Sequence, residues 1–422
     1  MEMTRVQLAQ GVNLTYLPAR KFKTSLLSAQ FVTPLRWETA GANALLAAVL
    51  RRGTVSCPDM GALSARMDNL YDASIDYTAR KKGENQCVGF VASFIDDRYA
   101  PGGEHLLEPV AELLGELVCD PVTYHGRFVP EYFDSEKSNL LEAIRSIIND
   151  KRDWADSRLL RTLCAGEPYA VPRLGDEETV DKLQALRVYD QYRQLISTAP
   201  LEIIYSGSAD LERVRLALAA AFATLPREEV RMISAAVPHV GRETVQYVED
   251  ALDVTQGKLG MGFSCGSSDM PALLMGNTLF GGSSNSKLFL NVREKLSLCY
   301  YASSLYHRQK GLITVSSGIE FQNYQRAYDE IMAQLEAVQK GELEDWELEG
   351  ARSTLLNSYA TVGDSQGKLE NFYLGQAATG QTETPEALAR AIETMTADRI
   401  CQAMETVRLD TVYFLKGKEV EA

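Results

Sequence analysis

One stretch of this 422-residue chain carries more structural information than any other, FGGSSNSKLFLNVREKLSLCYY at residues 280–301. It opens with a loop rich in glycine and serine, continues into a helix predicted from Ser286 to Lys295, and ends in a strand predicted from Tyr300. The loop lacks the Gly-Lys-Ser/Thr ending of a phosphate-binding loop and does not follow a strand in a βαβ unit. We therefore expect no nucleotide site here.

The rest of the chain reads as two halves with a similar order of strands and helices. In the first half, strands are expected at 6–17, 25–32, 74–81, 87–95 and 201–205, and helices at 39–52, 60–70, 106–118, 130–163, 179–196 and 210–225. In the second half, strands are expected at 244–249, 258–263, 300–306, 312–317 and 411–415, and helices at 271–279, 286–295, 323–339, 345–360 and 385–406. This repeated order indicates duplication of one α+β unit.

The best linker candidate runs from Pro226 to Gly241, where two prolines and a glycine enclose a run of mixed charge. It lies close to the middle of the chain. We therefore predict an N-terminal domain at 1–226 and a C-terminal domain at 242–422.

Composition excludes several classes of function. The chain has 43 Lys and Arg against 57 Asp and Glu, a net charge of −14 and a pI near 5.0. Nucleic acid and anionic lipid both attract clustered cations, so we expect neither as a partner. No apolar run is long enough to span a membrane, and the first residues lack the apolar stretch of a secretion signal, which predicts a cytoplasmic protein.

The residues that usually carry metal or nucleophilic chemistry do not form motifs. The four histidines, His105, His125, His239 and His307, are far apart in the sequence, and no Cys-x-x-Cys or Gly-x-Ser-x-Gly is present. The seven cysteines are scattered and odd in number, as expected of buried thiols rather than a disulfide framework. We therefore predict no cofactor and no metal.

The 280–301 stretch closely resembles the second-domain signature of the insulinase/pitrilysin class of zinc peptidases, which includes mitochondrial processing peptidase. That signature is a glycine-rich loop, a helix of the form S-x-L-F-x-x-V-R-E-K, and then L-x-Y. Val254-Thr255-Gln256-Gly257 upstream and Gly311 downstream also match. With the repeated order of elements, the resemblance implies an α+β fold of two similar domains, each a mainly antiparallel sheet packed with helices, arranged as a clam shell.

Active members of that class carry an inverted zinc motif, His-x-x-Glu-His, on a first-domain helix before a Gly-Thr pair. Counting back from Gly53-Thr54, the resemblance aligns Ala44 and Ala48 with the two histidines and Ala47 with the glutamate. The third ligand falls at Ala143, with Glu142 one position away as an alternative. Methyl groups cannot bind zinc, so the resemblance implies an inactive homologue with a buried Ala/Leu helix in place of the metal site.

The second-domain chemistry is retained. The resemblance aligns Arg293 and Tyr300 with the Arg and Tyr that hold the substrate carbonyl and stabilise the oxyanion, and Gly281 and Gly282 with the substrate-binding loop. Such donors suit developing negative charge. Tyr301 is the alternative ring if the alignment shifts by one residue. Both side chains could instead be ordinary structural residues.

These observations favour a non-catalytic subunit of a heterodimeric zinc peptidase. Its partner would be an active, zinc-bearing insulinase-like homologue, and together they would process a peptide; a homodimer is possible when the partner is absent. The alternative is a scaffold or peptide-binding protein with no proteolytic assembly. Hydrolysis by an unrecognised constellation of this chain's own is the weakest hypothesis.

Overall fold

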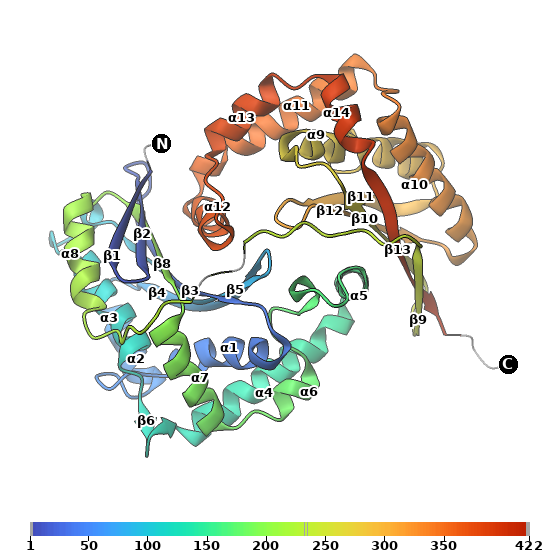
Figure 1. The fold of residues 1–422 in the computed structure, drawn as a ribbon. Coiled ribbons are helices and arrows are strands. Elements are labelled where there is room, and N and C mark those ends of the chain that lie inside the picture. Colours follow the sequence, from blue (N-terminus) through green and yellow to red (C-terminus); the bar gives the residue numbers. More distant parts are fainter. Residues whose placement is uncertain (1–2, 232, 234, 419–422) are drawn as a thin grey trace. The chain divides into compact units, whose positions relative to one another are not determined.

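The computed structural model describes residues 3–231, 233 and 235–418, which form two compact units (Figure 1). Unit 1 contains Met1–Arg145, Val171–Ala235 and Gly363–Thr382, and unit 2 contains Ser146–Ala170, Ala236–Val362 and Glu383–Ala422. Within the described residues, no helix combines the length and apolar character needed to cross a bilayer.

Unit 1 is built on a six-stranded sheet with the order β1-β2-β8-β3-β5-β4. Strands β2 and β8 are parallel, and every other neighbouring pair is antiparallel. The strands are β1 (Thr4–Ala9), β2 (Val12–Pro18), β3 (Thr24–Pro34), β4 (Ser74–Lys82), β5 (Asn85–Ile95) and β8 (Leu201–Gly207). The strands predicted at 74–81 and 87–95 are confirmed as β4 and β5, which form a hairpin, and β4 is an edge strand.

Helices cover both faces of this sheet. They are α1 (Trp37–Leu50), α2 (Met60–Asp68), α3 (Leu107–Cys119), α4 (Pro130–Ser146), α6 (Glu177–Asp181), α7 (Ala185–Thr198), α8 (Leu211–Ala221) and α12 (Gln366–Thr379), with a small ribbon of β6 (Thr123–Tyr124) and β7 (Arg127–Phe128). Leu27 and Ala29 of β3 belong to the core that includes Leu45 of α1, whereas Ser28 bonds to Glu370 of α12. Because successive side chains of a strand point to opposite faces, α1 and α12 pack on opposite sides of the sheet.

Unit 2 repeats the same topology. Its sheet has the order β11-β12-β10-β13-β9, with β9 and β13 parallel and the other pairs antiparallel. The strands are β9 (Gln246–Leu252), β10 (Gly257–Cys265), β11 (Cys299–His307), β12 (Leu312–Ile319) and β13 (Val407–Gly417). Apart from β1, which has no counterpart in the sheet of unit 2, the strands pair in the same way. Strands β2 and β9 pair with the last strand, the last strand pairs with β3 or β10, these pair with β5 or β12, and those pair with β4 or β11. The predicted α+β duplication is confirmed.

The helices of unit 2 also cover both faces. They are α5 (Lys151–Leu163), α9 (Met270–Phe280), α10 (Tyr324–Gln339), α11 (Asp345–Ala360), α13 (Pro385–Glu393), α14 (Ala397–Met404) and the π-helix η4 (Leu288–Lys295). The short 3₁₀ turns of the chain are η1 (Asp97–Tyr99), η2 (Ile147–Asn149), η3 (Pro168–Ala170), η5 (Phe321–Asn323) and η6 (Val362–Asp364). Gly260 and Gly262 let α5 approach β10, since a Cβ at Gly262 would lie 2.7 Å from Leu163 Cδ2.

The two halves exchange equivalent helices. Helix α5 follows α4 in the first half but packs on the sheet of unit 2, and α12 follows α11 in the second half but packs on the sheet of unit 1. The compact units therefore differ from the expected division at 146–170 and 363–382. The change of unit between Ala235 and Ala236 falls within the predicted linker, in which Met232 and Ser234 lie outside the described residues.

Candidate functional site

Helix α1 carries the positions that the zinc motif would occupy. Ala44, Ala47 and Ala48 are all buried, with no more than 5% of their surface exposed. Small side chains let this helix pack closely, and every residue from Ala40 to Leu50 is buried. Ala44 and Ala48 are one turn apart, so their methyl groups share one face of the helix.

That face borders a cavity of about 510 Å³ in unit 1. Its walls come from α1, the edge strand β4, α4 and the loop before α6, and they comprise Ala44, Ala48, Tyr77, Thr78, Ala79, Arg80, Glu136, Asn139, Leu140, Ala143, Arg173 and Leu174. The structure thus brings Ala143 next to Ala44 and Ala48, although Ala143 lies almost a hundred residues after Ala44 in the sequence. Ala47 is buried in the same helix but does not line the cavity, and neither does Glu142.

The groups around this cavity do not fit a zinc ion. A protein zinc site needs three or four nitrogen, sulfur or oxygen donors, and the aligned positions supply only methyl groups. The one carboxylate in the wall, Glu136, accepts a bond from Arg52 Nη1 at 2.9 Å. Arg52 also lies over the ring of Tyr132, 4.9 Å from its centre. This ion pair occupies the one acidic group that a metal would use.

In unit 2, close packing explains the two glycines of the predicted loop. The amides of Gly281 and Gly282 both donate to the Asn277 carbonyl at 2.9 Å, where α9 ends. A Cβ at Gly281 would lie 2.7 Å from Ser304 N, and one at Gly282 would lie 3.0 Å from Thr278 Cα. Side chains larger than hydrogen therefore do not fit, and a substrate contact for this loop stays a prediction.

Arg293 lies on a π-helix rather than on the α-helix that the sequence suggests. The wide turn is marked by the Leu296 amide, which donates to the Asn291 carbonyl five residues earlier at 3.1 Å. The Arg293 guanidinium lies 4.6 Å from the ring centre of Phe289 and 3.6 Å from Glu294 Oε1. Its side chain is 41% exposed, which leaves donors free to reach solvent or a ligand.

Tyr300 is 64% exposed at the start of β11, and its hydroxyl donates to Glu320 Oε1 at 3.0 Å. This bond raises the pKa of Tyr300, so the phenol stays protonated at neutral pH. The ladder between β11 and β12 shifts between Cys299 and Tyr301, which places Tyr300 in a bulge. Nearby Ser297 has a left-handed backbone with φ 49°, a conformation that costs energy for a residue other than glycine.

The alternative ring, Tyr301, lies against a cation of α5. The guanidinium of Arg152 on α5 lies 4.4 Å from its ring centre, and Lys258 Nζ lies 5.7 Å away. Within the described residues the structure records no contact between Arg293 and either tyrosine ring. The predicted pair is therefore close in sequence and joined by irregular backbone, but it is not hydrogen-bonded together.

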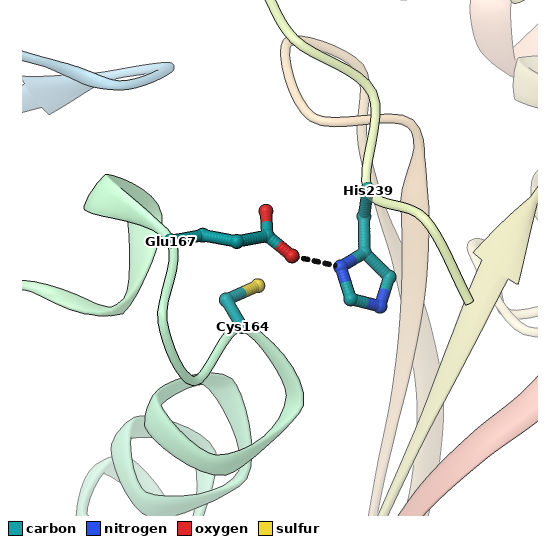
Figure 2. A group of neighbouring side chains, drawn as sticks. All are labelled: Cys164, Glu167 and His239. Carbon is teal, nitrogen blue, oxygen red and sulfur yellow. Dashed lines mark hydrogen bonds and ion pairs between the residues drawn. The ribbon is translucent and has the colours of Figure 1, made fainter. Parts of the chain in front are cut away.

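A second group in unit 2 was not expected as a unit from the sequence. Cys164 and Glu167, at the end of α5, face His239 (Figure 2), and their donor atoms all lie within 4.8 Å of one another. Among the described residues, this is the one place where three potential metal donors converge. The sequence hides it because His239 is more than seventy residues from the other two.

The bonding of this group supports a structural interpretation. His239 Nδ1 lies 2.5 Å from Glu167 Oε1, and its Nε2 lies 3.4 Å from Asp410 Oδ2. Glu167 also pairs with the buried Lys310, and Asp410 pairs with Arg242 at 2.5 Å. Each of the two carboxylates that face the His239 ring already pairs with a cation, so a divalent ion would add uncompensated charge. The network links the end of α5, the end of the linker, the turn before β12, and β13.

A duplicated α+β fold with alanines at the metal-ligand positions defines an inactive homologue of a zinc peptidase. The comparisons place the chain within one family. It is 35% identical over 416 residues to a Bacillus subtilis (strain 168) protein named "Probable inactive metalloprotease YmfF", and the match covers 97% of this chain and 96% of that one. Residues 182–355 match the model described as the peptidase M16 inactive domain. The chain belongs to the peptidase M16 family.

Solved structures show the same fold. A conserved protein from Enterococcus faecalis V583 superposes with a TM-score of 0.89 at 28% identity, and both chains are covered completely. A peptidase M16 inactive domain from Pseudomonas fluorescens gives a TM-score of 0.80 at 16% identity, again over the full length of both chains. The predicted class, an inactive insulinase-like homologue, is confirmed.

Proposed function

We propose that this chain is the non-catalytic subunit of a heterodimeric zinc peptidase. In this role it binds the peptide and supplies Arg293 and Tyr300 to the zinc site of an active homologue, for peptide processing or maturation. As part of this proposal, the chain is located in the cytoplasm and forms a homodimer when the partner is absent.

The observation that carries the proposal is the clustering of backbone irregularities around this pair. A π-helix holds Arg293, a left-handed residue follows at Ser297, and a bulge holds Tyr300. π-helices and bulges occur often next to functional sites, where they redirect side chains, and strain of this kind persists only when its surroundings impose it. A stretch with a purely structural role would gain stability from regular geometry.

The two side chains have suitable chemistry. A guanidinium and a protonated phenol are both donors, and a developing oxyanion is stabilised by donors held in place before the reaction. Glu320 orients the phenol of Tyr300 and keeps it protonated, and the Phe289 ring supports Arg293. At the positions aligned with the zinc motif, α1 carries only Ala44, Ala47 and Ala48, so the water-activating group would come from the partner.

A scaffold or peptide-binding protein without proteolytic assembly is the second candidate. One observation favours it: Arg293 and Tyr300 each have a partner within the chain, as structural residues do. Under this hypothesis the irregular backbone is a feature of packing, and substitution of either side chain would leave the activity of any partner unchanged.

The test uses this chain mixed with a zinc-bearing homologue and measures assembly and turnover on the same samples. With Arg293→Ala or Tyr300→Phe we expect turnover at saturating partner to fall about 10²–10³-fold while the complex still forms. Arg326→Ala and Tyr124→Phe are matched controls, because both side chains are exposed and distant in sequence from the pair. Unchanged turnover for both test variants would favour the scaffold.

A further inference from the structure

The cavity beside α1 has the properties of a ligand pocket. We infer that it binds a peptide residue whose side chain is apolar and whose neighbouring carboxylate is held by Arg173. This inference deepens the proposed function, because it names the class of peptide that the chain recognises. It concerns unit 1 alone and needs no partner subunit.

The floor of the cavity is apolar. Ala44, Ala48 and Leu140 are buried, and Leu174 and Ala143 continue the same surface. A volume of about 510 Å³ lies within the usual range for small-ligand pockets, roughly 300–1,000 Å³. Where histidine and glutamate would fill this space around a metal, three methyl groups leave it open for an aliphatic or aromatic side chain.

All charged side chains of the cavity wall except one form an ion pair with an opposite charge. Arg52 pairs with Glu136, and Arg80 makes two bonds of 2.6 Å to Glu370. Arg173 is exposed, and its Nη1 donates to the Ala79 carbonyl at 3.1 Å. Among the described residues no carboxylate pairs with it. The wall therefore carries one surplus positive charge, which favours an anionic ligand and disfavours a cationic one.

The same bond limits how a peptide can enter. Ala79 belongs to the edge strand β4, and an exposed edge carbonyl is a usual acceptor for an added strand. Because Arg173 already donates to that carbonyl, its side chain competes with a peptide that would pair with β4 at this residue. Recognition here depends on a side chain and a carboxylate rather than on strand addition. The carboxylate could be the C-terminus of the peptide or an acidic side chain.

The test measures fluorescence polarisation of labelled peptides with the full chain, without any partner. Four probes share a threonine- and serine-rich sequence. One ends in leucine with a free carboxylate, one ends in leucine amide, one ends in alanine with a free carboxylate, and one carries an internal leucine-glutamate pair and an amidated end. We expect leucine to bind more tightly than alanine. The leucine amide should bind about ten- to a hundredfold more weakly than the leucine acid if the C-terminus is recognised.

Two substitutions probe the pocket directly. Ala143→Leu should fill its mouth, and Arg173→Gln should remove its uncommitted cation; both residues are exposed, so neither change disturbs the core. Each should weaken binding of the best probe at least about tenfold. Ala219→Leu and Arg187→Gln alter exposed helical positions elsewhere in unit 1 and should leave binding unchanged.

The outcomes separate this inference from the proposed function. Tight binding of the internal leucine-glutamate probe would identify an acidic side chain as the source of the carboxylate. Equal binding of leucine and alanine probes, equal loss in test and control variants, or no binding of any probe would overturn the inference. Arg293 and Tyr300 lie in unit 2, outside the cavity. Chains with Arg293→Ala or Tyr300→Phe should therefore bind these probes as the wild type does, even where turnover with a partner is lost.

Discussion

Among single residues, Asp410 of β13 shows how one buried carboxylate bonds to side chains and backbone from more than one segment. It is 1% exposed, accepts from the Arg242 amide at 2.7 Å and from Thr411 Oγ1 at 2.7 Å, and pairs with the Arg242 guanidinium. Burial alone would raise the pKa of Asp410, but these hydrogen bonds and the Arg242 charge outweigh it and hold the pKa below its usual value. The ionised form therefore stabilises unit 2.

We expect Asp410→Asn to lower the free energy of unfolding by roughly 3–5 kcal/mol at neutral pH, because it leaves the buried groups around it uncompensated. Since the folded pKa is lowered, the stabilisation is complete above the unfolded carboxyl pKa of about 3.9 and is lost as the pH falls through the folded value. Urea unfolding at several pH values checks this. A difference between wild type and variant that grows towards acid pH would contradict it.

The alanines that the resemblance aligns with the zinc motif illustrate what a resemblance can predict for single residues. The spacing of Gly53-Thr54 was enough to select Ala44 and Ala48, and both line the cavity with Ala143. Sequence alone left Glu142 and Ala143 open, because a one-residue shift on a helix moves a side chain by 100° and only the packed structure shows which one faces the cavity.

Among secondary-structure elements, the exchanged helices α5 and α12 are the features that the sequence predicted least well. The interval 130–163 was expected to be one helix, but it breaks at 147–150, where the Asp150 side chain accepts from the Arg152 and Asp153 amides and starts α5. Helix α12 was not predicted at all. It is buried on nearly every side and contains Gly367 and Gly375, so it lacks the apolar stripe that identifies surface helices.

Features that depend on neighbouring residues in the sequence were predictable, whereas features that depend on tertiary contacts were not. Strands β4 and β5 were predicted because their extent depends on local residue types and on a short turn between them, which contains Gly83 with φ 57°. The π-helix at Arg293 and the bulge at Tyr300 depend on how η4 meets β11, and no local pattern of residues signals such irregularities. The exchange of α5 and α12 depends on which sheet each helix packs against, and such tertiary contacts leave no local pattern in the sequence.

We predict that Glu370 anchors α12. Its buried carboxylate accepts two bonds from Arg80 and one from Ser28 Oγ at 2.7 Å. Glu370→Gln should raise amide hydrogen exchange across Gln366–Thr379 at least about tenfold, because removing one partner of a buried ion pair costs several kcal/mol. Asp364→Asn, which removes an exposed pair with Lys21, should change exchange little. Equal effects of the two variants would contradict the anchoring role.

For the molecule as a whole, the linker joins two units that repeat one topology. Each end of the linker makes polar contacts with the unit that it adjoins. Arg227 donates to the carbonyls of Ile196 and Ala199 in unit 1, and His239 lies in the buried network of unit 2. We predict that limited proteolysis cuts first within the predicted linker, Pro226 to Gly241, because connections with few packed contacts open most easily. First cuts inside β10 would contradict this division.

We propose that this chain has no peptidase chemistry alone and contributes to that of a partner. The most direct measurement is hydrolysis of an unstructured peptide by the chain, by a zinc-bearing homologue and by their mixture, with zinc determined in each sample. We predict no hydrolysis and no stoichiometric zinc for the chain, and turnover in the mixture far above that of the homologue alone. One tightly held zinc per chain, hydrolysis by the chain itself, or a mixture no faster than the homologue would contradict the account.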